Sequence, residues 1–249
     1  MEIFWNTIAR YNAATWPWQI AIVAAAAVLT VLLYLRPTQN VKRAMKLFLA
    51  GLNAWIAVVY YLVWCGQRSH SDVLALFWGI MAVIWLYDLY ADFTRFERTS
   101  RPNGFALLLY LMPLVYPLFS LARGLSFPMM TMPVMPCSVA VFTIGLMLAF
   151  THRINIFLVL FLCHWALIGL AKVYFFGIPE DFLLAGALPL FPRIHRQEPR
   201  TAHQARRADA QRAVDPALHR HRPFLHRHAA APDPALRLTG RPPRFFGNR

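Results

Sequence analysis

Charged residues and cysteines are scarce in this chain, and their scarcity excludes several classes of protein. Only 14% of the 249 residues are Asp, Glu, Lys or Arg, whereas 58% are hydrophobic; soluble domains carry roughly 25% charged residues. The three cysteines form no Cys-x-x-Cys pair, which excludes a zinc ribbon and a thioredoxin-like motif. A phosphate-binding loop and the common hydrolase, metalloprotease and dinucleotide-binding motifs are also missing. These absences weigh against an enzyme, and we expect no cofactor and no metal site.

Long apolar stretches fill most of residues 18–192. A transmembrane helix needs about 20 mostly apolar residues, and the candidate spans are residues 18–35, 45–64, 73–90, 105–121, 137–150 and 154–176. A seventh stretch begins at Asp181 but meets Pro192 after a length that covers only about half of a bilayer. The sequence therefore predicts an all-α, polytopic transmembrane bundle with six complete spans and a truncated seventh. Residues 1–17 form either an interfacial helix or a loosely ordered terminus.

Basic residues in the links between spans predict the orientation. Cytoplasmic links of membrane proteins are enriched in Lys and Arg. Eight such residues follow the first, third and fifth spans: Arg36, Lys42, Arg43, Lys46, Arg95, Arg98, Arg101 and Arg153. The opposite set holds three: Arg10, Arg68 and Arg123. We therefore expect a bacterial inner-membrane protein with its N-terminus outside and its C-terminus in the cytoplasm.

The composition changes abruptly at Arg193. Of residues 193–249, 36 are Arg, Ala, Pro or His, and Arg193 falls where the seventh span should continue. Three explanations compete: a disordered basic tail that binds anionic lipid or nucleic acid, a regulated or processed extension, and a frameshift in GC-rich coding DNA. We favour the frameshift, because a broken helix and a changed composition coincide. Residues 1–192 are then the transmembrane domain and residues 193–249 a disordered tail, and nucleic acid is not expected as a partner.

One segment of the chain carries a family resemblance. Pro136, Cys137, Phe142, Thr143 and Gly145 form the pattern Pro-Cys-x-x-x-x-Phe-Thr-x-Gly. In this pattern the chain resembles a family of uncharacterised bacterial multi-pass membrane proteins, domain of unknown function six-zero-six-four. Further matches are Tyr11-Asn12, Trp16-Pro17 and Gly177-Ile178-Pro179-Glu180-Asp181. The resemblance covers about residues 5–190 and implies a helical membrane bundle, but no reaction.

Four residues in or beside the spans are candidates for a functional role. His164 lies midway along a span, where an ionisable group is a functional hypothesis by default; it could ligate haem, relay a proton or bind a substrate, or be a neutral histidine bonded across helices. Asn53 should bond a neighbouring helix. Cys65 and Cys137 fall at the predicted outer face, where a disulfide could persist, or they are two unpaired apolar-type cysteines.

Asp88 and Asp92 lie near one end of the third span, with Arg95 and Arg98 one or two turns further on. Local ion pairs at the membrane boundary are the expected arrangement of these four residues.

The buried polar residues and the many aromatics favour the transport or binding of a small molecule or ion within the bundle. The alternative is a structural or accessory membrane subunit whose polar residues serve only helix packing. A membrane enzyme or haem carrier is a third possibility. The lipid bilayer is the one partner that the sequence predicts directly, and the oligomeric state is open.

Overall fold

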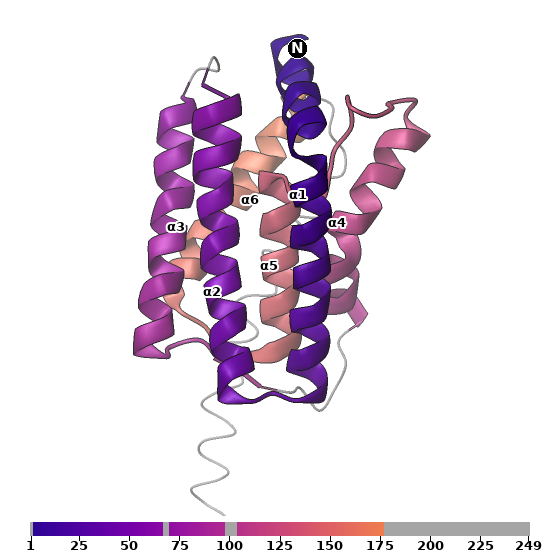
Figure 1. The fold of residues 1–249 in the computed structure, drawn as a ribbon. Coiled ribbons are helices and arrows are strands. Elements are labelled where there is room, and N and C mark those ends of the chain that lie inside the picture. The colour runs from indigo at the N-terminus through magenta and orange to yellow at the C-terminus, as the bar shows by residue number, and fades with distance from the viewer. Residues whose placement is uncertain (1, 67–69, 98–103, 177–249) are drawn as a thin grey trace, which may run out of the picture. The chain divides into compact units, whose positions relative to one another are not determined.

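The computed structural model describes residues 2–66, 70–97 and 104–176, and these form a helical bundle (Figure 1). The seventh span and the tail of residues 193–249 lie outside the described residues. The elements are α1 (Glu2–Leu35), α2 (Gln39–Trp55), η1 (Ile56–Trp64), α3 (Ser71–Ala91), β1 (Arg95–Phe96), α4 (Gly104–Ala122), α5 (Pro136–Phe150), β2 (Thr151–Arg153) and α6 (Ile156–Phe176). The all-α class predicted from the sequence is confirmed.

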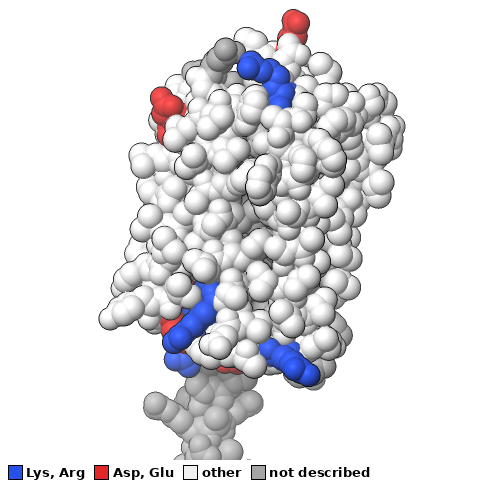
Figure 2. Space-filling view, in the orientation of Figure 1, with Lys and Arg blue, Asp and Glu red and all other residues white. Residues whose placement is uncertain are grey.

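Four of the described helices are long and apolar enough to cross a membrane: α1, the continuous α2–η1 helix (Gln39–Trp64), α3 and α4. Two further apolar helices are shorter, namely α5 and residues Ile156–Gly169 of α6. The six predicted spans correspond to six apolar helices, but only four of the described helices have spanning length, so the prediction of six complete spans is confirmed only in part. The surface in Figure 2 agrees with a membrane-spanning bundle, because charged side chains lie at its two ends and a broad uncharged band lies between them.

Helix α1 is continuous over 34 residues, so the segment predicted as an interfacial helix or a loosely ordered terminus is one helix with the first predicted span. Its first half buries one stripe at helical spacing: Phe4, Ile8, Tyr11, Thr15 and Gln19. This stripe explains the continuity, because packing on the bundle stabilises helical turns that a free terminus would lose. Pro17 inside the helix removes one backbone hydrogen bond, which membrane helices tolerate where other groups satisfy the freed carbonyl.

The second span changes from an α-helix to a π-helix at Ile56. Residues Ile56–Trp64 form a π-helix, in which the Cys65 N–H donates to the carbonyl of Tyr60, five residues back. The wider turn accompanies two adjacent tyrosines that are both buried. Tyr60 packs edge-on against Tyr11, with ring centroids 5.0 Å apart, and Tyr61 packs against Trp165 of α6 at 6.5 Å. Because π-helical turns are rare and are frequent at functional sites, this half of the span is a candidate for part of a functional site.

Helix α5 is the most enclosed helix among the described residues. All residues from Ser138 to Met147 are buried, and a helix that is buried on every side belongs to the core of a bundle. Gly145 explains how α4 approaches so closely. A Cβ at that position would lie 2.8 Å from the Leu109 carbonyl carbon and from the Tyr110 Cα, closer than real Cβ atoms come. Glycine is therefore required where these two helices cross.

A short antiparallel pair, β1 with β2, ties the end of α3 to the start of α6. Phe96 is opposite Thr151, and the Glu97 N–H donates to the Phe150 carbonyl at 2.6 Å. The Phe96 ring is fully buried and stacks on Trp85, with centroids 6.5 Å apart and planes 6° from parallel. The strands are two and three residues long, so they fasten the helices without forming a second layer.

Candidate functional site

An ion-pair cluster is buried at the end of the bundle where α2 begins and α3 ends, which we call the basic end. Its members are Lys46, Asp88 and Asp92. The Lys46 ammonium lies 3.1 Å from Asp88 Oδ2 and 2.7 Å from Asp92 Oδ1. It also donates to the Asp88 carbonyl at 3.1 Å. Lys46 is 2% exposed and Asp88 is fully buried, so the pair is shielded from solvent.

The ion-pair cluster caps the C-terminus of α3. Asp92 adopts a left-handed conformation, with φ of 51°, and ends the helix. The Thr94 N–H donates to Asp88 Oδ1 at 2.9 Å, and the Thr94 hydroxyl accepts from the Asn155 N–H at 3.3 Å. A cation beside the last carbonyls of a helix is favoured by the helix dipole. The Lys46 ammonium therefore satisfies the end of α3 and joins it to α2, and the bond between Thr94 and Asn155 joins this end to the residue before α6.

Sequence reasoning missed this role of Lys46. The cluster of basic residues around Lys46 predicts a place in a link, whereas the structure places Lys46 inside α2 and buries it. The expected pairing of Asp92 with Arg95 is present at 3.8 Å between exposed side chains, but the buried partner of both aspartates is Lys46. Arg98 lies outside the described residues. The spacing of 42 residues between Lys46 and Asp88 gives no local signal of their contact.

A second polar network occupies the first half of α1, and we call it the amide network: Tyr11, Asn12, Thr15, Gln19 and Trp55. The Tyr11 hydroxyl donates to the Val134 carbonyl at 2.7 Å and accepts from Trp55 Nε1 at 3.1 Å. The Asn12 amide donates to the carbonyls of Pro128 and Met130, both at 2.8 Å. These bonds fasten the loop before α5 to α1, more than 100 residues earlier in the chain.

Two amide oxygens in the bundle have no hydrogen-bond partner among the described residues, Gln19 Oε1 and Asn53 Oδ1. Gln19 is 1% exposed, and its amide nitrogen donates to Thr15 Oγ1 at 3.0 Å. Asn53 is fully buried, and its nitrogen donates to the Leu49 carbonyl of its own helix at 2.7 Å. The expected bond from Asn53 to a neighbouring helix is thus absent from the described structure. Buried acceptors without donors cost about 1–3 kcal/mol each in proteins.

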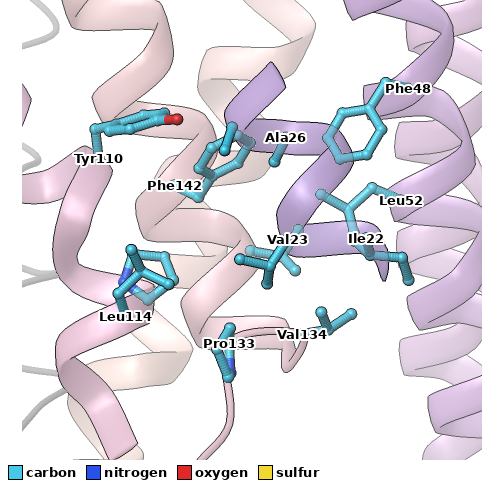
Figure 3. A pocket seen from close by; sticks show the side chains of 13 residues that line it. Ile22, Val23, Ala26, Phe48, Leu52, Tyr110, Leu114, Pro133, Val134 and Phe142 are labelled. Carbon is cyan, nitrogen blue, oxygen red and sulfur yellow. The ribbon is translucent and has the colours of Figure 1, made fainter. Parts of the chain in front are cut away.

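An apolar cavity lies next to the amide network, between α1, α2, α4 and α5. Its volume is about 70 Å³, and it is partly open to the surroundings. Figure 3 shows its walls, where Val23 and Ala26 of α1 face Tyr110 and Phe142 across the space. Val134, whose carbonyl accepts from Tyr11, forms one end. The lining residues are Ile22, Val23, Ala26, Ala27, Phe48, Leu52, Tyr110, Pro113, Leu114, Pro133, Val134, Val139 and Phe142.

The other predicted residues are separated. His164 lies on the exposed side of α6, beside the Phe77 ring at 5.6 Å, rather than in the interior that the sequence suggested. Cys65 is buried after η1, and Cys137 is half-buried in the first turn of α5. Their disulfide stays a prediction. The described residues hold no cluster of three or more metal-ligand side chains.

The motif residues of α5 have structural positions that fit their types. Pro136 opens the helix, where its missing N–H costs nothing. The Thr143 hydroxyl donates to the Val139 carbonyl one turn back, at 2.8 Å. Phe142 packs against Tyr110, and Gly145 permits the close crossing with α4. The motif therefore encodes the α4–α5 contact and one wall of the cavity.

Several apolar helices of spanning length, an uncharged surface band and polar groups buried inside indicate a helical membrane protein. The chain matches a family of unknown function (DUF6064) over residues 1–192. The chain belongs to this family, which confirms the resemblance seen in the sequence. No curated protein and no solved structure matches the chain significantly.

Proposed function

We propose that the protein binds a small molecule or ion inside its helical bundle, in transport or in binding alone. The observation that carries the proposal is the buried Gln19 Oε1, which has no donor among the described residues. Gln19 precedes Ile22 and Val23 by three and four residues, so all three share one face of α1. Because Ile22 and Val23 line the cavity, Gln19 stands on the helix face that the cavity uses, one turn before its lining residues.

The chemistry of this region defines the class of ligand. The cavity walls are apolar, so the body of the ligand is apolar. The amide oxygen needs a hydrogen-bond donor or a cation, so the ligand carries a hydroxyl or an ammonium group, or is itself a metal cation. An amphipathic alcohol or amine fits both requirements, whereas an anion without a donor group does not fit the second.

Thermal unfolding of the purified protein tests this proposal. Short-chain alcohols and alkylammonium ions should raise the melting temperature more than ethers of the same size, which lack a donor. In a second set of measurements, Na⁺ and K⁺ are tested as ligands in the same assay. The Gln19→Leu variant should lose the difference between alcohol and ether. The idea fails if no solute protects the wild-type chain from heat.

A matched pair of variants separates cavity binding from general solvent effects. Ala26 lines the cavity, whereas Ala24 is exposed on the same helix and lies outside it. Ala26→Leu should abolish the stabilisation by alcohols, and Ala24→Leu should leave it unchanged. Equal responses in the two variants would place the solute effect in the micelle rather than in the cavity.

A structural or accessory subunit is the second candidate, and the ion-pair cluster favours it. Lys46, Asp88 and Asp92 contact one another and the end of α3, so they need no external ligand. If Asn53→Ala and His164→Ala change only thermal stability, and a stable partner co-purifies, packing and assembly become the better explanation.

We also propose the orientation with the N-terminus outside, in a bacterial inner membrane. The burial of Lys46 removes one residue from the basic links, and the remaining imbalance still favours this direction. A reporter fused after residue 66 should lie outside and one fused after residue 97 should lie in the cytoplasm, and the reverse result would contradict the orientation. On this orientation Cys65 and Cys137 face an oxidising compartment, and mass spectrometry of the unreduced protein tests their pairing.

The frameshift proposal for residues 193–249 gains support from the family match, which ends at residue 192. That position is where the apolar pattern stops and the Arg-rich composition begins. Resequencing the gene from about codon 180 onward decides the matter. A missing or extra base that restores an apolar helix supports the frameshift, and an unchanged sequence makes the basic tail a real element.

A further inference from the structure

A groove runs between α2 and α3 on the outside of the bundle at its basic end. It is lined by Arg43, Ala44 and Leu47 of α2 and by Leu86, Leu89 and Tyr90 of α3, and its volume is about 400 Å³. In each wall, one residue stands three and four positions from the other two, so all three lie on one face of their helix. The groove therefore follows the direction of the two helices.

The groove changes in character along its length. Arg43 and Tyr90 stand at the end nearest the helix termini, and Tyr90 is 91% exposed. Leu47 and Leu86, which are 56% and 48% exposed, continue the groove toward the uncharged band. A cation and an aromatic thus mark the membrane boundary, and apolar side chains mark the hydrocarbon side.

The nearby carboxylates do not neutralise Arg43. Among the described residues, the ion pairs of Asp88 and Asp92 are with Lys46 and Arg95. The guanidinium of Arg43 is exposed at the mouth of the groove and matches the geometry of a phosphate, which it can bind through two N–H groups. Charge complementarity therefore selects an anionic occupant with an apolar body.

We propose that this groove binds an anionic phospholipid, with the phosphate at Arg43 and an acyl chain along Leu47 and Leu86. Basic pockets between transmembrane helices are a recurrent site for such headgroups. The site faces the lipid, so it is separate from the interior cavity and does not depend on the proposed ligand there.

Native mass spectrometry of the full chain tests the site. The detergent-solubilised protein is mixed with equal amounts of phosphatidylglycerol and phosphatidylcholine that carry the same acyl chains. One basic residue near a membrane surface contributes about a fivefold preference for anionic lipid. Arg43→Gln should reduce the preference for phosphatidylglycerol by about that factor. The arginines of residues 193–249 are present in every variant, so their contribution cancels in the comparison.

Arg36→Gln is the matched control, because Arg36 is exposed at the same end of the bundle but does not line the groove. It should change the preference much less than Arg43→Gln. Ala44→Trp keeps every charge and fills the groove, and it should reduce phosphatidylglycerol binding as well. Equal losses in Arg36→Gln and Arg43→Gln, or full binding by Ala44→Trp, would overturn the proposal in favour of diffuse electrostatic attraction. An absence of any preference in the wild-type chain would overturn it too.

Discussion

Removing the Lys46 ammonium while keeping the bulk of its side chain should strongly destabilise the bundle. Lys46→Met leaves the Asp88 carboxylate fully buried, with the Thr94 N–H as its remaining hydrogen bond at 2.9 Å. It also removes the bond to the Asp88 carbonyl at the end of α3. Breaking a buried ion pair from one side costs about 3–5 kcal/mol, because the other charge stays buried without compensation. Asp92 is 45% exposed, so its share of the loss is small.

A second substitution separates the charge from the packing. Asp88→Asn keeps an oxygen that can accept from the Thr94 N–H and removes the negative charge. The double variant Lys46→Met/Asp88→Asn should therefore recover part of the stability that Lys46→Met loses. We expect a coupling free energy of about 2 kcal/mol between the two positions, within the range seen for residues in contact.

Equilibrium unfolding in mixed micelles, followed by tryptophan fluorescence, measures these free energies. Trp85 lies one helical turn before Asp88 and stacks on Phe96, so its emission should report the same end of the bundle. Lys42→Met is the control, because Lys42 is only half-buried and lies outside the ion-pair cluster. If Lys46→Met costs no more than Lys42→Met, the buried pair is not what holds α2 to α3, and the reasoning is refuted.

Two further substitutions test close packing and the amide network. Gly145→Ala should lower the unfolding free energy by about 1–3 kcal/mol through overpacking, because the added Cβ meets the backbone of α4; Gly51→Ala, with no atom within 4 Å, should not destabilise the protein. Tyr11→Phe should cost about 1–3 kcal/mol, since the Val134 carbonyl and the Trp55 N–H lose their shared partner. Tyr90→Phe, at a side chain that is 91% exposed, should be neutral in the same unfolding measurement.

The class of fold follows from composition and from apolar runs, because a bilayer of fixed thickness imposes a minimum helix length that the sequence displays directly. Helix α1 is an element that apolar runs alone do not predict in full. Its first half contains Glu2, Asn12 and Gln19 and therefore does not resemble a span, yet it is helical because its polar side chains bond inward. The hydropathy of a segment does not indicate whether its polar groups find partners elsewhere in the fold.

The site residues were harder to predict than the spans, and the reason is the distance between contacts along the chain. Lys46 meets Asp88 across 42 residues, and Tyr11 meets Val134 across 123. Neither pair leaves a periodic signal. Asn53 was found because an amide inside an apolar run is conspicuous, but its bonding pattern was not predictable. His164 was conspicuous for the same reason, and the structure places it on the exposed side of α6.

The two polar regions of the interior differ in how completely they are satisfied, and this difference decides which of them suits a ligand. At the basic end, Asp88 Oδ2 also has no hydrogen bond, but the Lys46 ammonium lies 3.1 Å from it, so an incoming ligand would have to displace a paired cation. In the amide network and at Asn53, an acceptor is left over on α1 and on α2. A ligand with a donor gains there without displacing anything. Exchange of a solute is therefore less costly at the amides than at the charges, and we expect variants of Gln19 to change binding while variants of Lys46 change stability.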